Sequence, residues 1–313
     1  MFPLVLLLIA ATAAISSAGA QDSASSAAVR FSANVDLVTL PITVRDTKGR
    51  PVTDLLQQNF GVYENGVRQS IHMFRHEDIP VTVGLAIDHS GSMRPKMGEV
   101  IAAARTFVKS SNPEDEMFVV TFNERVYPGF ADAVHFTNRF DQLESVIRRA
   151  PLGGQTALYD AIFEGLEQVG LGSREKKALI VISDGGDNAS AHTLAEVLKL
   201  AGRSTAVIYA IGIFDSDDAD RNPDTLRRLA HATGGGAYFP ALPDGIIATC
   251  EGIARDIRSQ YLIGYVPSPA AQQAGYRTIR VTAHAVAKGK LSVRTRAGYF
   301  ATGSAHLKDQ ASQ

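Results

Sequence analysis

Three short polar segments contain the side chains best suited to bind a metal ion. They are residues 88–92 (Asp-His-Ser-Gly-Ser), 153–156 (Gly-Gly-Gln-Thr) and 183–187 (Ser-Asp-Gly-Gly-Asp). Carboxylate and hydroxyl oxygens suit hard cations such as Mg²⁺, which favour near-octahedral geometry and usually keep some water. We therefore expect two carboxylates and three hydroxyls to act as metal ligands, namely Asp88, Ser90, Ser92, Thr156 and Asp184.

This ligand set would leave the bound ion able to accept one further anionic group. Two carboxylates neutralise a divalent ion, and the hydroxyls fill coordination positions without adding charge. The ion would stay electrophilic, so the carboxylate of a partner molecule would suit the remaining position.

The chain around these segments alternates between strand and helix patterns. Residues 81–87 form an apolar, β-branched run that is typical of a strand buried on both faces. The expected strands are 81–87, 117–122, 178–182 and 206–213, and the expected helices are 95–108, 138–150, 157–169, 193–200, 222–231 and 243–257. This alternation predicts an α/β fold with a doubly wound, mostly parallel central sheet and helices on both faces. The polar segments follow strands or precede helices, where ligands bind in open α/β sheets.

β-rich segments flank this α/β domain, whose expected bounds are 79–257. In the N-terminal segment, 34–78, apolar residues alternate and Asn65-Gly66 indicates a hairpin. In the C-terminal segment, 258–300, strands are expected at 261–266, 278–283 and 291–295, and a polar tail follows at 301–313. Because domain termini often lie close together, the two segments could pair into one β-module.

The N-terminus has the composition of a secretory signal peptide. Residues 1–20 contain no Asp, Glu, Lys or Arg, and an apolar run over 3–15 precedes Ala18-Gly19-Ala20, a small-x-small cleavage pattern. We expect cleavage after Ala20, a flexible leader over 21–33, and export to the periplasm or the extracellular space. The alternatives are a buried N-terminal helix and a membrane anchor that is never cleaved, although the run is shorter than the roughly 20 residues that span a bilayer.

Composition excludes several classes of function. Lys and Arg number 31 and Asp and Glu 32, and the net charge of −1 gives no global attraction to nucleic acid or an anionic membrane. A single cysteine excludes an intrachain disulfide and a cysteine-built zinc or iron–sulfur site. That residue, Cys250, lies in an apolar stretch and is expected to be a buried, unreactive thiol.

Taken together, the three polar segments resemble the metal-ion-dependent adhesion site of the von Willebrand factor type A domain. The family pattern has Asp-x-Ser-x-Ser in the first loop, a Thr in the second and an Asp in the third, and each position is filled here. The resemblance covers about residues 81–257, and the flanks look like those of a bacterial subfamily of exported proteins related to this domain. It implies a Rossmann-like fold and a metal-competent site. In the family the serines and the Thr coordinate directly or nearly so, and the aspartates often act through water.

Simpler structural roles for the same residues stay open. Asp88 and Thr156 could cap helices, and Asp184 with the glycine after it could form an ordinary turn. Ser90 does not lie in a Gly-x-Ser-x-Gly elbow, and no His-Glu-x-x-His spacing is present, which disfavours serine and zinc hydrolases.

Three other features near these segments have less specific interpretations. The acidic loop over 215–220 (Asp215, Asp217, Asp218 and Asp220) could bind Ca²⁺, but its pattern favours a solvated loop before a helix. Asp187 could form hydrogen bonds that orient the metal ligands without binding the ion itself. His89 is expected at the surface.

From the residues and the resemblance together, we expect an exported, non-enzymatic binding or adhesion module. It would hold Mg²⁺, with Mn²⁺ or Ca²⁺ as alternatives, and dock an acidic residue of a protein partner on the ion. Neither nucleic acid nor a small-molecule cofactor is expected as a partner, and the sequence leaves the oligomeric state open. Two alternatives remain, a metal-dependent hydrolase that uses the same ion as a Lewis acid and an envelope scaffold with a purely structural metal.

Overall fold

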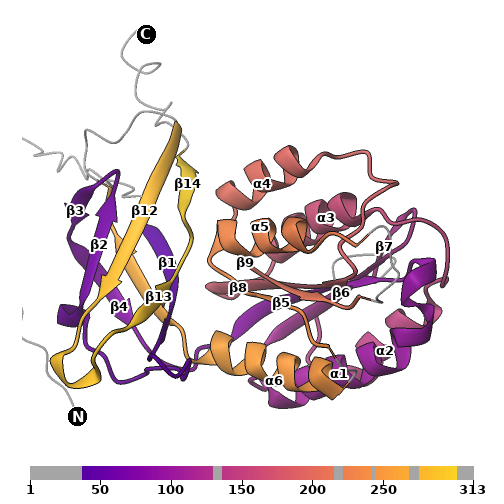
Figure 1. Ribbon diagram of the computed structural model, residues 1–313, viewed down its shortest axis with the longest axis horizontal. Helices are drawn as coiled ribbons and strands as arrows, with labels where there is room; N and C mark the ends of the chain where they lie inside the picture. The colour runs from indigo at the N-terminus through magenta and orange to yellow at the C-terminus, as the bar shows by residue number, and fades with distance from the viewer. Residues whose placement is uncertain (1–36, 130–135, 215–220, 242–243, 268–274, 302–313) are drawn as a thin grey trace, which may run out of the picture. The chain divides into compact units, whose positions relative to one another are not determined.

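The computed structural model describes residues 37–129, 136–214, 221–241, 244–267 and 275–301. Within these ranges the chain forms an α/β domain (residues 81–258) and a β-module (residues 38–75 and 261–301), whose strands precede and follow the domain in sequence (Figure 1). The expected signal peptide and leader, the polar tail after residue 301 and the acidic loop 215–220 lie outside the described residues. Within the described ranges, no helix is long and apolar enough to cross a membrane.

The α/β domain is built on a six-stranded sheet with the order β10-β9-β8-β5-β6-β7. Its strands are β5 (Val81–Asp88), β6 (Glu116–Phe122), β7 (Val126–Pro128), β8 (Lys176–Ser183), β9 (Val207–Gly212) and β10 (Ala237–Tyr238). Neighbouring strands run parallel except β7, which pairs antiparallel with β6 at one edge. Every residue of β5 is buried, as its unbroken apolar run predicts for a strand covered on both faces.

Helices cover both faces of this sheet (Figure 1). They are α1 (Met97–Ser110), α2 (Phe140–Arg149), α3 (Leu158–Gly170), α4 (Leu194–Arg203), α5 (Pro223–Thr233) and α6 (Asp244–Arg258). Side chains of α1, α2 and α6 share one hydrophobic cluster with the sheet, and those of α3, α4 and α5 share the other. The predicted doubly wound, mostly parallel fold is therefore confirmed.

Local sequence explains where several helices begin and end. Thr193 and Asn222 cap α4 and α5, because their side chains accept hydrogen bonds from the backbone N–H of Glu196 and Thr225. Gly234 ends α5 in the left-handed conformation, with φ of 84°. The helix expected from residue 95 begins earlier, as a 3₁₀ helix η2 (Gly91–Lys96) that continues into α1.

The β-module consists of two four-stranded sheets, with the orders β13-β1-β11-β4 and β14-β12-β2-β3. The strands before the α/β domain are β1 (Val38–Arg45), β2 (Phe60–Glu64), β3 (Val67–Gln69) and β4 (Ile71–Arg75), with a short 3₁₀ helix η1 (Gln57–Asn59). Those after it are β11 (Tyr261–Tyr265), β12 (Gly275–Ala283), β13 (Ser292–Arg294) and β14 (Gly298–Ala301), with η4 (Val286–Lys288).

Both sheets of the module combine strands from the two flanks. β11 lies between β1 and β4, and β12 pairs with β2, all antiparallel. Apolar side chains of both sheets form one cluster, which includes Leu40, Val62, Tyr261 and Ile279. The expected pairing of the flanking segments is therefore present, and neither flank alone could complete this core.

Asp256, near the end of α6, joins the α/β domain to the β-module. Its carboxylate is 1% exposed and accepts hydrogen bonds from Arg45 of β1 and, at 2.9 Å, from Arg294 of β13. The Tyr238 hydroxyl of β10 donates to the same carboxylate at 3.1 Å. The buried charge is thus neutralised and hydrogen-bonded, which is the condition under which a buried ion pair is tolerated.

We expect Asp256→Ala to lower the free energy of unfolding by roughly 2–4 kcal/mol, because two partly buried guanidinium groups lose their carboxylate. Urea denaturation followed by circular dichroism would measure the loss. Glu251→Ala on the same helix is the control: Glu251 is 44% exposed and 3.8 Å from Arg255, so the expected change is below about 1 kcal/mol. Similar losses for both variants would contradict the role assigned to Asp256.

Candidate metal centre

The first and third polar segments leave the sheet side by side. β5 and β8 pair in parallel with Ile87 opposite Ile182, so Asp88 and Ser183 emerge at the same edge of the sheet. On the other side of β5, Asp88 lies opposite Phe122, the last residue of β6. The carboxyl ends of three parallel strands therefore define the site, as expected for an open α/β sheet.

Each of the two aspartates uses one oxygen locally and directs the other to the neighbouring loop. Asp88 Oδ1 accepts from Ser90 N at 2.8 Å, and its Oδ2 accepts from Ser183 Oγ at 2.6 Å. Asp184 Oδ1 accepts from Gly186 N at 3.1 Å, and its Oδ2 accepts from Ser92 Oγ at 2.5 Å. The turn that the sequence left open for Asp184 is thus present, whereas Asp88 does not cap η2, whose N-cap is Ser90 without a side-chain hydrogen bond. In both aspartates the local hydrogen bond uses only one carboxylate oxygen.

The two serines of the first loop continue this network. Ser90 Oγ lies 3.2 Å from Ser92 Oγ, which in turn donates to Asp184. Four of the five predicted ligands, Asp88, Ser90, Ser92 and Asp184, are therefore gathered by hydrogen bonds that run between the first and third loops. Ser183 was given no role from the sequence, although its position after the strand run was visible.

The second loop, with Thr156, joins this group through its backbone. Gly91 N donates to Gly154 O at 3.2 Å, and Thr156 N donates to the Asn188 side chain at 2.8 Å. The N-cap residue of α3 is Ala157, and no side chain caps this helix. Thr156 is buried, and in the described part of the chain no hydrogen bond links its hydroxyl to the other four predicted ligands.

The electrostatics of the site are unfavourable without a cation. The pKa of Asp88 is raised to about 6, because burial and the nearby charge of Asp184 raise it by more than the hydrogen bonds from Ser183 and Ser90 lower it. In the described ranges no Lys or Arg forms an ion pair with either carboxylate. A cation between the loops would neutralise two buried negative charges.

The donor set fits a hard divalent ion that relies on hydroxyls. Among the described residues there is no cluster of three or more His, Cys, Asp or Glu side chains that could hold a metal ion. A site of two carboxylates would therefore need the Ser and Thr oxygens to complete the coordination. Oxygen-only coordination suits Mg²⁺, Mn²⁺ or Ca²⁺ rather than a soft metal.

The expectation that His89 lies at the surface was wrong. His89 is 1% exposed, and its ring nitrogens lie 3.2 Å from Ile87 O and 2.9 Å from Ile147 O. Ile147 belongs to the last turn of α2, where carbonyl groups have no donor within the helix. The ring therefore satisfies a helix end from inside the domain, a long-range contact that the local motif does not reveal.

Asp187 and Asp160 hold the third loop on the first turn of α3. Asp187 Oδ1 accepts from Tyr159 N at 3.1 Å, and Asp160 accepts from His192 N and Nδ1 at 2.8 Å and 2.7 Å. No hydrogen bond from Asp187 to the predicted ligands is present in the described part of the chain. Asp187 therefore supports the site only indirectly, because it fixes the path of the third loop. Nothing in the sequence pointed to the role of Asp160.

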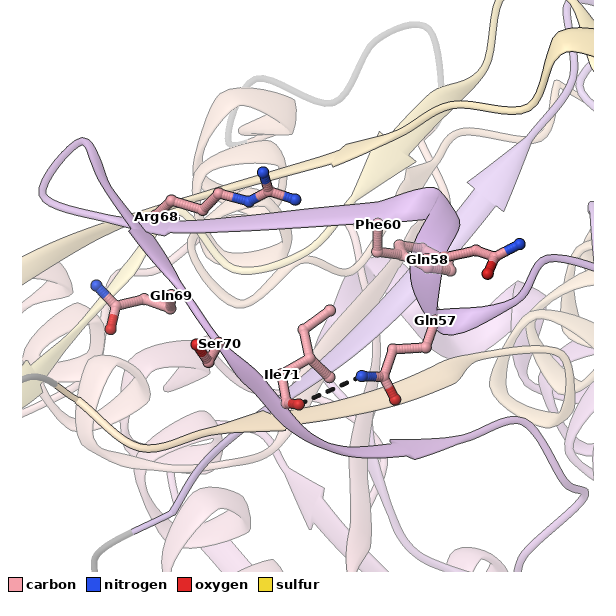
Figure 2. Close-up of a pocket in the computed structure, with 7 residues that line it drawn as sticks. All are labelled: Gln57, Gln58, Phe60, Arg68, Gln69, Ser70 and Ile71. Carbon is pink, nitrogen blue, oxygen red and sulfur yellow. Dashed lines mark hydrogen bonds between the residues drawn. The ribbon is translucent and has the colours of Figure 1, made fainter.

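A pocket of about 750 Å³ lies elsewhere, in the β-module (Figure 2). It is lined by Gln57, Gln58, Phe60, Arg68, Gln69, Ser70 and Ile71. Gln57 Nε2 donates to Ile71 O across it at 3.3 Å. Its lining holds no carboxylate, histidine or thiol, so it offers neither metal ligands nor an acid–base pair.

Cys250 is buried on α6, as predicted. Burial raises the pKa of its thiol to about 12, so the nucleophilic thiolate is scarce at neutral pH.

The sequence matches the family model of the von Willebrand factor type A domain over residues 83–243. The match spans just over half of the chain, and the chain belongs to this family. No curated protein matches the sequence.

Several solved structures are similar in fold. A von Willebrand factor type A protein from Catenulispora acidiphila is 14% identical, with 88% of this chain and 76% of that chain covered and a TM-score of 0.51. The conserved hypothetical protein BatB from Bacteroides thetaiotaomicron is 16% identical over 57% of this chain and 100% of its own, with a TM-score of 0.46. The vWF domain of the type V pili tip protein Mfa5 from Porphyromonas gingivalis is 15% identical over 57% and 95%, with a TM-score of 0.48. At such identity the C. acidiphila structure supports the fold alone.

We predict that Asp88→Asn stabilises the metal-free protein at pH 7.5 by about 2 kcal/mol, because it removes one of two buried like charges. A carboxyl pKa raised from 3.8 to about 6 in the folded state means that wild type loses stability relative to this variant as pH rises through that range. Urea denaturation in EDTA between pH 4 and 8 would measure the difference. Asp224→Asn, with an 84% exposed side chain, is the control and should show none. A difference for Asp88→Asn that does not vary with pH would contradict this electrostatic account.

Proposed function

We propose that this protein is an exported binding module that holds a divalent cation and docks an acidic side chain of a protein partner on it. The observation that carries the proposal is the pair of buried carboxylates, Asp88 and Asp184, each of which accepts a hydrogen bond from a serine hydroxyl and neither of which forms an ion pair with a cationic side chain among the described residues. Mg²⁺ is the proposed ion, with Mn²⁺ and Ca²⁺ as alternatives. Export rests on the signal-peptide pattern of residues 1–20.

Five side chains would hold the ion: Asp88, Ser90, Ser92, Thr156 and Asp184. When bound, the ion would supply an electrophilic site for an oxygen anion. The serine hydroxyls, now held by hydrogen bonds to each other and to Asp184, would turn their lone pairs to the ion. The hydroxyl of Thr156, which has no hydrogen bond to the other four predicted ligands in the described structure, would turn to the ion in the same way.

A binding role is favoured over catalysis by the family, whose domains typically act as interaction or adhesion modules. Two aspartates would neutralise the ion and the hydroxyls would add no charge, so the ion would keep one coordination position for a partner carboxylate. The hydrolase alternative would be supported by turnover of phosphoesters or esters that Asp88→Ala abolishes. The scaffold alternative would be supported by partner binding that survives chelation.

We predict that saturating Mg²⁺ raises the melting temperature of the purified protein by on the order of 5 °C and that EDTA reverses the shift, because an ion bound only to the folded state stabilises it. Asp184→Ala should abolish the shift while the circular dichroism spectrum stays that of the wild type. Asp224→Ala, at an exposed position on α5, should keep the full shift. A wild-type protein that shows no shift at millimolar Mg²⁺, Mn²⁺ or Ca²⁺ would refute the proposal.

We also predict that capture of a protein partner from cell-envelope extract depends on the ion. Immobilised wild-type protein should retain the partner in Mg²⁺ and release it in EDTA, because the partner's carboxylate would bind the ion itself. Asp88→Ala should capture none in either buffer, and Asp224→Ala should behave like wild type. Equal capture with Mg²⁺ and EDTA would favour the scaffold with a structural metal.

A further inference from the structure

The pocket of the β-module lies at the edge where the chain passes from one sheet to the other. β3 is the edge strand of one sheet and β4 of the other, and Ser70 is the one residue between them. The pocket measures about 750 Å³, which lies within the range of about 300–1,000 Å³ typical of small-ligand sites. Its lining residues all come from the stretch 57–71, apart from the candidate metal centre (Figure 2).

Two glutamine amides of the pocket wall are held in place by the sheet edges. Gln57 Nε2 donates to Ile71 O at 3.3 Å, and Gln69 Nε2 donates to Val67 O at 3.1 Å. Gln69 is only 9% exposed, so packing also restrains its side chain. Within the described ranges neither amide oxygen accepts a hydrogen bond, so each amide keeps its oxygen as an acceptor and its second N–H as a donor.

Arg68 supplies a positive charge at the same pocket. Its side chain is exposed, and among the described residues its guanidinium forms neither an ion pair nor a hydrogen bond. The pocket wall contains no carboxylate, and Glu64 of the paired strand β2 is buried in an ion pair with Arg277 at 2.7 Å. The N–H donors of Arg68 are therefore available to an anion, and a planar carboxylate matches them in a bidentate pair.

A second cation continues this charge along the face of the sheet. Tyr63 of β2 lies opposite Arg68 of β3 on one side and opposite Arg280 of β12 on the other, so the three side chains share a face. The Arg280 guanidinium lies 4.1 Å from the centroid of the Tyr63 ring and has no ion pair in the described part of the chain. Two strand spacings, roughly 10 Å, separate the two arginines. This face suits a ligand that carries more than one anionic group.

The same geometry disfavours an extended peptide or a lipid as the ligand. A peptide that adds to a sheet edge needs the free backbone groups of the edge strand. Here Val67 O on β3 and Ile71 O on β4 are already engaged by glutamine amides (Figure 2). The apolar part of the wall consists of Ile71 and Phe60, and Phe60 is only 4% exposed, so the pocket offers little apolar surface to a side chain or an acyl chain.

We propose that this pocket, with the face that carries Arg68 and Arg280, binds an acidic polysaccharide through the carboxylates of its uronic acid residues. Fixed amides that both donate and accept hydrogen bonds match sugar hydroxyls, which also do both. Arg68 pairs with one carboxylate, and Arg280 pairs with a carboxylate further along the polymer. This binding needs no metal ion, so it is independent of the function proposed for the metal centre.

Isothermal titration calorimetry of the full-length protein in EDTA tests the proposal. The chelator removes any ion that would otherwise hold carboxylates of the probe at the metal centre. The probes are the tetramers of galacturonic acid and of mannuronic acid, and at least one of them should bind. The neutral tetramer of galactose should bind at least roughly tenfold more weakly than that acidic tetramer, because it offers no carboxylate to the guanidinium groups.

Three variants locate the binding site. Arg68→Gln should weaken binding of the acidic tetramer by roughly tenfold, because a charge-assisted pair is lost. Gln57→Ala leaves the net charge unchanged and should weaken binding by roughly fivefold, because hydrogen bonds to the sugar are lost. Arg228→Gln makes the same charge change as Arg68→Gln at an exposed position on α5 and should bind like wild type. Circular dichroism checks that each variant is folded.

Failure of both acidic tetramers to bind the wild-type protein overturns the proposal. Tetraglutamate that binds as tightly as the acidic tetramer also overturns it, because the face would then recognise acidic peptides. Unchanged binding in Gln57→Ala overturns it as well, because the arginines would then attract polyanions by charge without the pocket. None of these outcomes bears on the metal centre, which the Mg²⁺-dependent shift in melting temperature tests separately.

Discussion

The parallel pairing of β5 with β8 is the constraint on which the candidate site depends. The side chains of these strands are buried against helices on both faces, so packing fixes which residue of one strand lies opposite which residue of the other. A shift of one residue would exchange the faces of every side chain in the strand. The hydrogen bond from Ser183 to Asp88 exists because that register holds, and the apolar core thereby determines the geometry of a polar site.

The same arrangement makes the site electrostatically costly. Asp88 is removed from water next to Asp184, and hydrogen bonds from serines offset only part of the loss of hydration. Such departures from the rule that buried charges are paired are expected at functional positions rather than in a structural core. The contrast with Asp256 is informative, because that buried carboxylate is matched by two arginines and a tyrosine. The Asp256 carboxylate links the α/β domain to the β-module, whereas Asp88 and Asp184 form no ion pair with Lys or Arg among the described residues.

Patterns local in the sequence predicted most of the fold. The apolar runs of the central strands and the spacing of the helices were sufficient, because burial on both faces leaves a strong local signal. The short strands β7 and β10 were missed, because three and two residues carry no recognisable period.

Contacts between distant segments account for what was not predicted at the site. The burial of His89 depends on the end of α2, and the second loop is held by Asn123, the residue after β6, whose backbone O accepts from Ala157 N and whose side chain donates to Pro151 O. Neither position has a periodic or motif signal of its own.

The interleaved strands of the β-module bear on the order in which the chain folds. Arg277 and Glu64 form a buried ion pair in the module although they lie 213 residues apart in sequence. Closing so long a loop in an unfolded chain carries an entropic cost that grows with its length. The strands that enter and leave the α/β domain, β4 and β11, are hydrogen-bonded neighbours, with Phe74 opposite Ile263. A folded α/β domain therefore brings the two halves of the module together. Its folding, which relies on contacts within residues 81–258, shortens the loop that the chain must close to pair the remaining strands of the β-module.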